Sequence, residues 1–155
     1  MRWICLTGLL LLTLLPAQAG HSAPKILLRI HVQTTGEGLS NMQATTIALP
    51  PNGEQIQIRA LPEVTEGELI DATQDASGRI HFLFNHEGQV SLSAVTAENQ
   101  GRILVVFING FIVYAPIIDT QIVNGELVLP HPINPQALQF LQDMARRNVR
   151  QAAKT

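Results

Sequence analysis

The residues of this chain that could do chemistry are five histidines, a run of acidic residues and scattered serines. His81 and His86 fall in an expected strand and in the turn after it, and no His-x-x-x-His helix or His/Asp cluster at ligand spacing accompanies them. His21 precedes the first expected strand, and His131 stands between two prolines; neither has a partner nearby in sequence. Solvent-facing histidines are the ordinary interpretation, so no metal site is predicted.

The acidic run comprises Glu63, Glu66, Glu68, Asp71 and Asp75. Two neighbouring carboxylates could serve acid–base chemistry or bind a cation. The start of a helix explains the run better, because acidic side chains in the first turn suit the helix dipole, and Asp71 and Asp75 would lie four apart on a solvated face. The chain also lacks a Gly-x-Ser-x-Gly elbow, a glycine-rich phosphate loop and a His-Glu-x-x-His helix.

These residues predict no catalytic site, no cofactor-binding site and no metal site, and we interpret the protein as non-enzymatic. The alternative is that serine, histidine and aspartate side chains distant in sequence converge in space. That would make a small ligand-binding protein or a hydrolase with a polar site assembled from loops. A deep pocket that joins His81 or His86 to a carboxylate would favour this alternative.

Residues 1–19 have the pattern of a signal peptide: a short cationic start, an apolar run over residues 4–15 and the small-residue site Ala17-Gln18-Ala19. The apolar run is well short of the roughly 20 residues that a spanning helix needs. We therefore expect cleavage after Ala19 and a periplasmic or secreted protein with no integral membrane segment; an uncleaved anchor is the alternative. Cys5 lies inside this leader, so the mature chain would contain no thiol.

The charge balance does not indicate nucleic-acid binding, because 10 Lys and Arg residues face 12 Asp and Glu residues. Basic charge gathers near the C-terminus at Arg146, Arg147, Arg150 and Lys154, behind an apolar helix. Cations there favour the negative end of the helix dipole, so a solvated helix end explains them better than a membrane patch. Residues 148–155 are expected to form a flexible basic tail.

Apolar periodicity predicts one α+β domain over residues 25–147. The expected strands are residues 25–34, 45–49, 54–60, 79–85, 104–108, 111–115 and 126–129. In the first of them, Leu27, Arg29 and His31 share a face that should be partly wet. Strands dominate without regular strand-helix-strand alternation, so we expect an antiparallel or mixed sheet with about three helices packed on one face.

Three helices are predicted from their start signals and apolar spacing. The first begins at Thr65, where Glu68 completes a capping box, and ends at residues 75–78. The second covers residues 87–98. The third begins with Asn134 as the cap and Pro135 at the first helical position, and it presents a single apolar stripe.

The segment GRILVVFINGFIVYAPIIDTQIVNG, residues 101–125, carries the strongest hairpin signal in the chain. Asn109-Gly110 supplies the two positive φ values of a type I′ turn between two apolar runs. Because these runs are apolar at nearly every position, they require burial on both faces or cover by another surface. If one face stays open, a patch or strand edge for an extended peptide is predicted at Phe111, Val113, Tyr114 and Ile118.

This hairpin and its surroundings resemble the large periplasmic head of SecD, the accessory subunit of the bacterial protein-export translocase. The resemblance covers about residues 61–141, beginning with LPEVTEGELIDAT and passing through GQVSLSAVT. Asn109-Gly110 takes the place of that family's Asp-Gly turn, Ala115-Pro116-Ile117 matches its "aPvI", and Gly125 closes its "I..G". None of these residues is a reactive group, so the resemblance implies a fold and structural motif and not a catalytic site.

The resemblance implies a protein partner, since the head of SecD is thought to engage preprotein emerging from the translocon. The chain departs from the family where its membrane helices and its "GlDl.GG" opening would stand. We therefore expect a free-standing secreted relative of the head: a non-enzymatic extracytoplasmic interaction module for preprotein or for an envelope or translocase partner.

Overall fold

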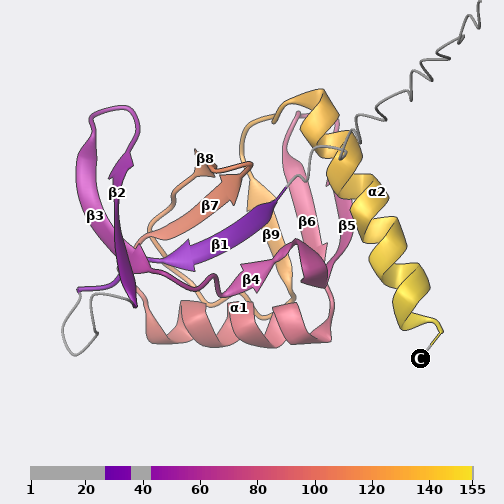
Figure 1. Ribbon diagram of the computed structural model, residues 1–155, viewed down its shortest axis with the longest axis horizontal. Coiled ribbons are helices and arrows are strands. Elements are labelled where there is room, and N and C mark those ends of the chain that lie inside the picture. Colours follow the sequence, from indigo (N-terminus) through magenta and orange to yellow (C-terminus); the bar gives the residue numbers. More distant parts are fainter. Residues whose placement is uncertain (1–26, 36–42, 155) are drawn as a thin grey trace, which may run out of the picture.

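The computed structural model describes residues 27–35 and 43–154. The expected signal peptide and the start of the first expected strand lie outside these ranges. Within them, the chain forms an α+β fold (Figure 1). The strands are β1 (Leu28–Val32), β2 (Ala44–Leu49), β3 (Glu54–Arg59), β4 (Val64–Thr65), β5 (Leu69–Gln74), β6 (Ile80–Phe84), β7 (Leu104–Ile108), β8 (Phe111–Tyr114) and β9 (Glu126–Leu129). The helices are α1 (His86–Glu98) and α2 (Pro135–Ala152), and a 3-10 turn covers Glu66–Glu68.

The strands form three sheets, and all the strand pairs are antiparallel. The central sheet has the order β4-β1-β7-β8, the side sheet has the order β5-β6-β9, and β2 pairs with β3 alone. In Figure 1 the β2–β3 hairpin projects at one end of the molecule and α2 lies at the other, beside β5. The predicted α+β class is confirmed, with the strands divided among several sheets.

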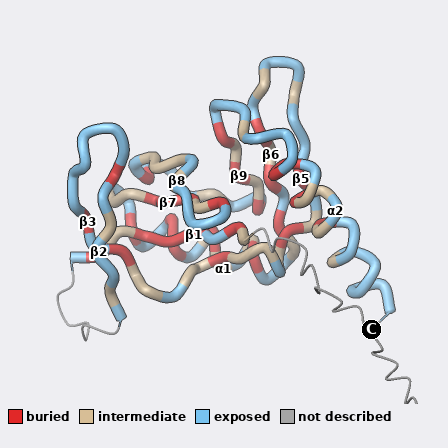
Figure 2. The backbone as a smooth tube through the Cα atoms, turned by 45° about the horizontal axis from the view of Figure 1, so that its top comes forward, coloured by how far each residue is buried: buried red, intermediate tan, exposed pale blue. Residues whose placement is uncertain are grey.

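The main hydrophobic core combines residues from the central sheet, the side sheet and both helices. Strand alternation sets this core, because every second residue of β6 (Ile80, Phe82 and Phe84) is buried in it. Figure 2 shows the buried positions concentrated in these strands. The two faces of β7 are both covered: Val106 belongs to the main core, whereas Val105 joins a second cluster beneath the β2–β3 hairpin.

The structure has two α-helices where the sequence predicted three. The capping box at Thr65 does form: the Thr65 N–H donates to the Glu68 carboxylate at 2.8 Å, and the Gly67 N–H donates to Thr65 Oγ1 at 3.2 Å. It caps only the 3-10 turn, after which the chain continues as β5. The prediction was wrong because a capping box fixes one turn, while pairing with β6 makes the next residues a strand.

The predictions for α1 and α2 are confirmed, and Asn134 caps α2 by accepting from the Gln136 N–H at 2.8 Å. Helix α2 ends at Ala152, so residues 148–152, which were expected in a flexible tail, continue the helix instead. Neither helix of the described ranges combines the length and the apolar character that crossing a membrane requires.

Two glycines let α1 approach its neighbours closely. At Gly88, in the first turn of α1, an added Cβ would lie 2.8 Å from Phe84 Cβ and 2.9 Å from Glu68 Cβ. At Gly125, just before β9, it would lie 2.9 Å from Gln89 Cβ, and φ there is 70°. The helix start is therefore pressed against the side sheet with no space for a methyl group on either side.

Candidate functional site

A groove of about 620 Å³ lies between the tip of the β7–β8 hairpin and the beginning of α2. Its apolar lining is Ile108, Phe111, Val113, Pro132, Ile133, Ala137 and Phe140. Asn109, Asn134 and Gln136 add polar but uncharged groups, and none of the described residues that line the groove carries a charge. The groove can therefore offer apolar contact and neutral hydrogen bonds to a ligand.

Strand β8 lies along this groove and ends the order of the central sheet. Its register with β7 shifts between Val106 and Phe107, a bulge of the kind that re-aims side chains at sheet edges. Phe111 is 75% exposed and Val113 is 37% exposed, so the outward side chains of this edge are apolar. An edge with unpaired backbone groups and apolar side chains can accept another extended strand.

The structure brings together part of the predicted interaction surface. Phe111 and Val113 both line the groove, whereas the half-buried Tyr114 packs against the main core. Ile118 is only 5% exposed and belongs to that core, so its inclusion in an exposed patch was wrong. The reason lies in the backbone: the Ile118 N–H donates to the Arg102 carbonyl at 2.8 Å, which returns the chain along β7 and turns Ile118 inward.

The residues of the structural motif hold the hairpin in shape. Asn109 and Gly110 have φ values of 55° and 80°, as a type I′ turn requires. Asn109 also fastens the turn to the start of β1, because its N–H donates to the Leu27 carbonyl at 3.0 Å and its Oδ1 accepts from the Leu27 N–H at 3.2 Å. After Ala115, the Pro116 carbonyl accepts from the Leu104 N–H at 2.9 Å, so pairing continues past β8.

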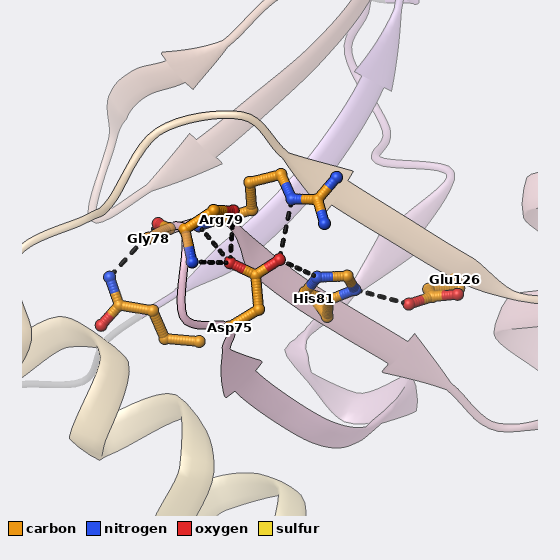
Figure 3. A network of polar contacts seen from close by, with 7 residues as sticks. Asp75, Gly78, Arg79, His81 and Glu126 are labelled. Atoms are coloured by element: carbon orange, nitrogen blue, oxygen red, sulfur yellow. Dashed lines mark hydrogen bonds and ion pairs between the residues drawn. The ribbon is translucent and has the colours of Figure 1, made fainter.

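A second group of polar residues lies on the outer face of the side sheet (Figure 3). His81 on β6 bridges two carboxylates: Nδ1 lies 2.7 Å from Glu126 Oε1 on β9, and Nε2 lies 3.2 Å from Asp75 Oδ2 in the β5–β6 turn. Asp75 also accepts hydrogen bonds from the Ser77 hydroxyl at 2.6 Å and from Arg79 Nε at 2.8 Å. We call Asp75, Ser77, Arg79, His81 and Glu126 the His81 network.

The charges of this network stabilise one another. The hydrogen bond to Glu126 and then the one to Asp75 raise the pKa of His81 above its usual value. Hydrogen bonds from Ser77, and then from Arg79 and His81, hold the pKa of Asp75 well below its usual range. Both shifts favour the charged forms of His81 and Asp75.

The geometry leaves the network little capacity for catalysis or metal binding. The two ring nitrogens of His81 point in opposite directions and each already faces a carboxylate, so neither is free to act as a base or a ligand. In the described part of the chain, no group of three or more His, Cys, Asp or Glu side chains could hold a metal ion. His86 and His131 are exposed and stand apart from this network.

Sequence reasoning missed this network because it placed Asp75 at the end of a helix. The segment Asp75-Ala76-Ser77-Gly78-Arg79 does carry a turn signal, and Gly78 has the φ of 88° that such a turn uses. That signal could have identified a β5–β6 hairpin and thus placed Asp75 near His81. Glu126 joins through the β6–β9 register, which no local pattern encodes.

No protein-family model matches this chain, and no curated protein matches it by sequence. The structure is similar to SecDF, described as a membrane component that enhances protein export, with a TM-score of 0.52 and 19% identity. A structure of SecDF in a super-membrane-facing form gives a TM-score of 0.54 and 20% identity. Each similarity covers 77% of this chain, but only 61% and 18% of the respective SecDF chains. The resemblance found in the sequence is thus confirmed for the fold: the described domain has a SecD-like α+β fold.

Proposed function

We propose that this protein is a non-enzymatic extracytoplasmic module that binds an extended polypeptide at β8 and the groove beside it. The observation that carries the proposal is the combination of an open sheet edge with an uncharged groove of about 620 Å³. Backbone pairing with β8 would provide affinity for any extended chain, and the groove would select apolar side chains.

The proposed partner is a preprotein or another envelope protein in extended form. SecDF is described as enhancing protein export, and its fold resembles that of this domain. The signal-peptide pattern of residues 1–19 supports an extracytoplasmic setting. Disulfide-free unfolded chains expose the apolar segments that such a groove would bury.

Binding of a fluorescently labelled, carboxymethylated polypeptide to the protein, followed by fluorescence anisotropy, tests the proposal. Phe111→Asp should weaken binding about tenfold or more, since it places an uncompensated charge in an apolar contact. Leu61→Asp is the matched control, because Leu61 is an 81% exposed apolar residue that does not line the groove. Absence of saturable binding, or an equal loss in both variants, would overturn the proposal.

A further inference from the structure

A second pocket of about 280 Å³ lies on the other face of the central sheet, where the β2–β3 hairpin covers it incompletely. Its apolar walls come from the central-sheet side, with Leu27 and Phe107, and from the β2–β3 side, with Ile47, Ile58 and Ala60. Arg29 and His31 of β1 and Thr45 of β2 provide its polar groups. The pocket therefore joins a cation and a histidine to an apolar chamber, a combination absent from the lining of the β8 groove.

His31 lines this pocket, and its hydrogen-bond partner determines which ring nitrogen carries the hydrogen. The sequence predicted a partly wet side chain, but His31 is 7% exposed because the β2–β3 hairpin folds over it. Its Nδ1 lies 2.8 Å from the Arg59 carbonyl, which can only accept, so Nδ1 carries the hydrogen. The ring stands edge-on to Phe107, with centroids 5.4 Å apart and an interplanar angle of 82°.

This arrangement leaves Nε2 as an acceptor, with no described residue placed to donate to it. Burial lowers the pKa of His31, and the charge of Arg29 acts in the same direction. The hydrogen bond to the Arg59 carbonyl and the charge of Glu63 act in the opposite direction. The net effect favours the neutral ring, in which Nε2 can accept a hydrogen bond or take up a proton.

Arg29 contributes a positive charge that the described protein does not neutralise. It is exposed, it lies on the same face of β1 as His31, and it forms no ion pair with a described carboxylate. The nearby Glu63 is already engaged by Arg59 at 2.9 Å. A guanidinium beside apolar walls is complementary to a carboxylate that carries a hydrocarbon group.

We propose that this pocket binds the carboxylate of a small apolar acid. Arg29 pairs with the carboxylate, the apolar walls enclose the hydrocarbon group, and His31 takes up one proton from solvent and donates Nε2–H to a carboxylate oxygen. The acid is either a free alkyl carboxylic acid or the C-terminal carboxylate of a polypeptide that ends in an apolar residue. The inference is independent of polypeptide binding at β8.

Isothermal titration calorimetry at pH 6.5 provides the first test, with octanoate and an N-acetylated tetrapeptide ending in leucine as probes. Saturable binding of at least one probe is expected, and Arg29→Gln should weaken it about tenfold or more, because it removes a charged hydrogen-bond donor. Arg146→Gln is the matched control, since it removes an exposed arginine from α2, far from this pocket. Binding of neither probe, or equal binding by Arg29→Gln and wild type, would overturn the inference.

The probes also distinguish the two sources of carboxylate. Preference for octanoate indicates a free acid, and preference for the peptide indicates a chain terminus; each supports the carboxylate site. The peptide with a C-terminal amide is the decisive negative control, because it retains the apolar group without the charge. If the amide and the acid bind equally well, the inference is wrong.

Proton uptake gives a readout that does not depend on a variant. NMR titration of the His31 ring should show that its pKa rises when the bound probe is present, since an adjacent carboxylate favours the imidazolium. Calorimetry in buffers of different ionisation enthalpy should show proton uptake near neutral pH. An unchanged His31 titration in the saturated complex would contradict the proposed role of Nε2.

Discussion

The groove beside β8 and the His81 network differ in whether their side chains already have interaction partners within the protein. The network consists of four ionisable side chains and the Ser77 hydroxyl, and each of them faces a partner of opposite charge or a hydrogen-bond partner. The groove consists of ordinary apolar side chains, and its most exposed member, Phe111, lies at an open sheet edge. If the proposed function is correct, the most reactive side chains of this molecule are structural and the binding surface is apolar.

The physical reason is that binding releases free energy only where the free protein leaves something unsatisfied. Apolar surface removed from water contributes roughly 25 cal/mol per Å², so the groove gains by accepting a partner. The His81 network would have to exchange existing ion pairs and hydrogen bonds for new ones, with little net gain. We infer that the network stabilises the side sheet, and the proposed function places partner binding at the groove.

The largest expected effect is a difference in unfolding free energy between substitutions on the two faces of β6. Phe82→Ala should lower the free energy of unfolding by about 3–5 kcal/mol, because Phe82 is fully buried in the main core and its removal leaves a cavity. His81→Ala, one residue earlier on the outer face, should cost less. Urea unfolding followed by circular dichroism measures both, and an equal cost would show that the network matters as much as the core.

An intermediate effect is expected when the network loses its acceptor. Asp75→Ala leaves Ser77, Arg79 and His81 without their common carboxylate, so the melting temperature should fall. The fall should be smaller than for Phe82→Ala, because these groups reach solvent. Asp71→Ala on the exposed side of β5 is the matched carboxylate control and should have almost no effect. If Asp75→Ala and Asp71→Ala have the same melting temperature, the network has no stabilising role.

The smallest expected effect is a dependence on pH. Because the pKa of His81 is raised in the folded state, its stabilisation is fully present below the ordinary histidine value of 6.5 and is lost as pH rises through the folded pKa. The depressed pKa of Asp75 makes its contribution present above the ordinary aspartate value of 3.8 and lost in stronger acid. The network should therefore stabilise most between these two values.

Comparison with His81→Gln isolates this contribution from the other titrating groups. The difference in melting temperature between wild type and the variant should be largest near about pH 5 to 6 and should shrink toward about pH 9. The subtraction is needed because the lowered pKa of His31 has the opposite effect, destabilising the fold as pH falls. A constant difference across this range would show that His81 does not act through its charge.

Sequence patterns predicted most of the local structure because the deciding interactions are local. The Asn109-Gly110 turn, the Asn134 cap and the alternation of β6 each depend on residues within a few positions of one another. Both apolar runs of the hairpin were expected to be buried on both faces or covered by another surface. The two hydrophobic clusters cover the two faces of β7, whereas β8 keeps Phe111 and Val113 exposed.

The remaining features depend on contacts between distant segments. Thr65 and Glu68 form the predicted cap, but the later pairing of β5 with β6 determines that no helix comes after it. His31 is buried by the β2–β3 hairpin, and the apolar pattern of the sequence does not predict that this hairpin lies over β1. His81 and Glu126 meet across a strand register, so neither segment alone could predict the network.

Gly88 and Gly125 lie where α1 packs closely against its neighbours, and this packing limits which side chains the two positions can carry. A Cβ added at Gly88 would lie within 3.0 Å of Phe84 and Glu68, and one added at Gly125 would lie within 3.0 Å of Gln89, so space is restricted on two sides of the first turn of α1. A single extra carbon at either position would act as a wedge between the helix and the strands. These two glycines thus set how closely α1 can approach β6 and the segment that leads into β9.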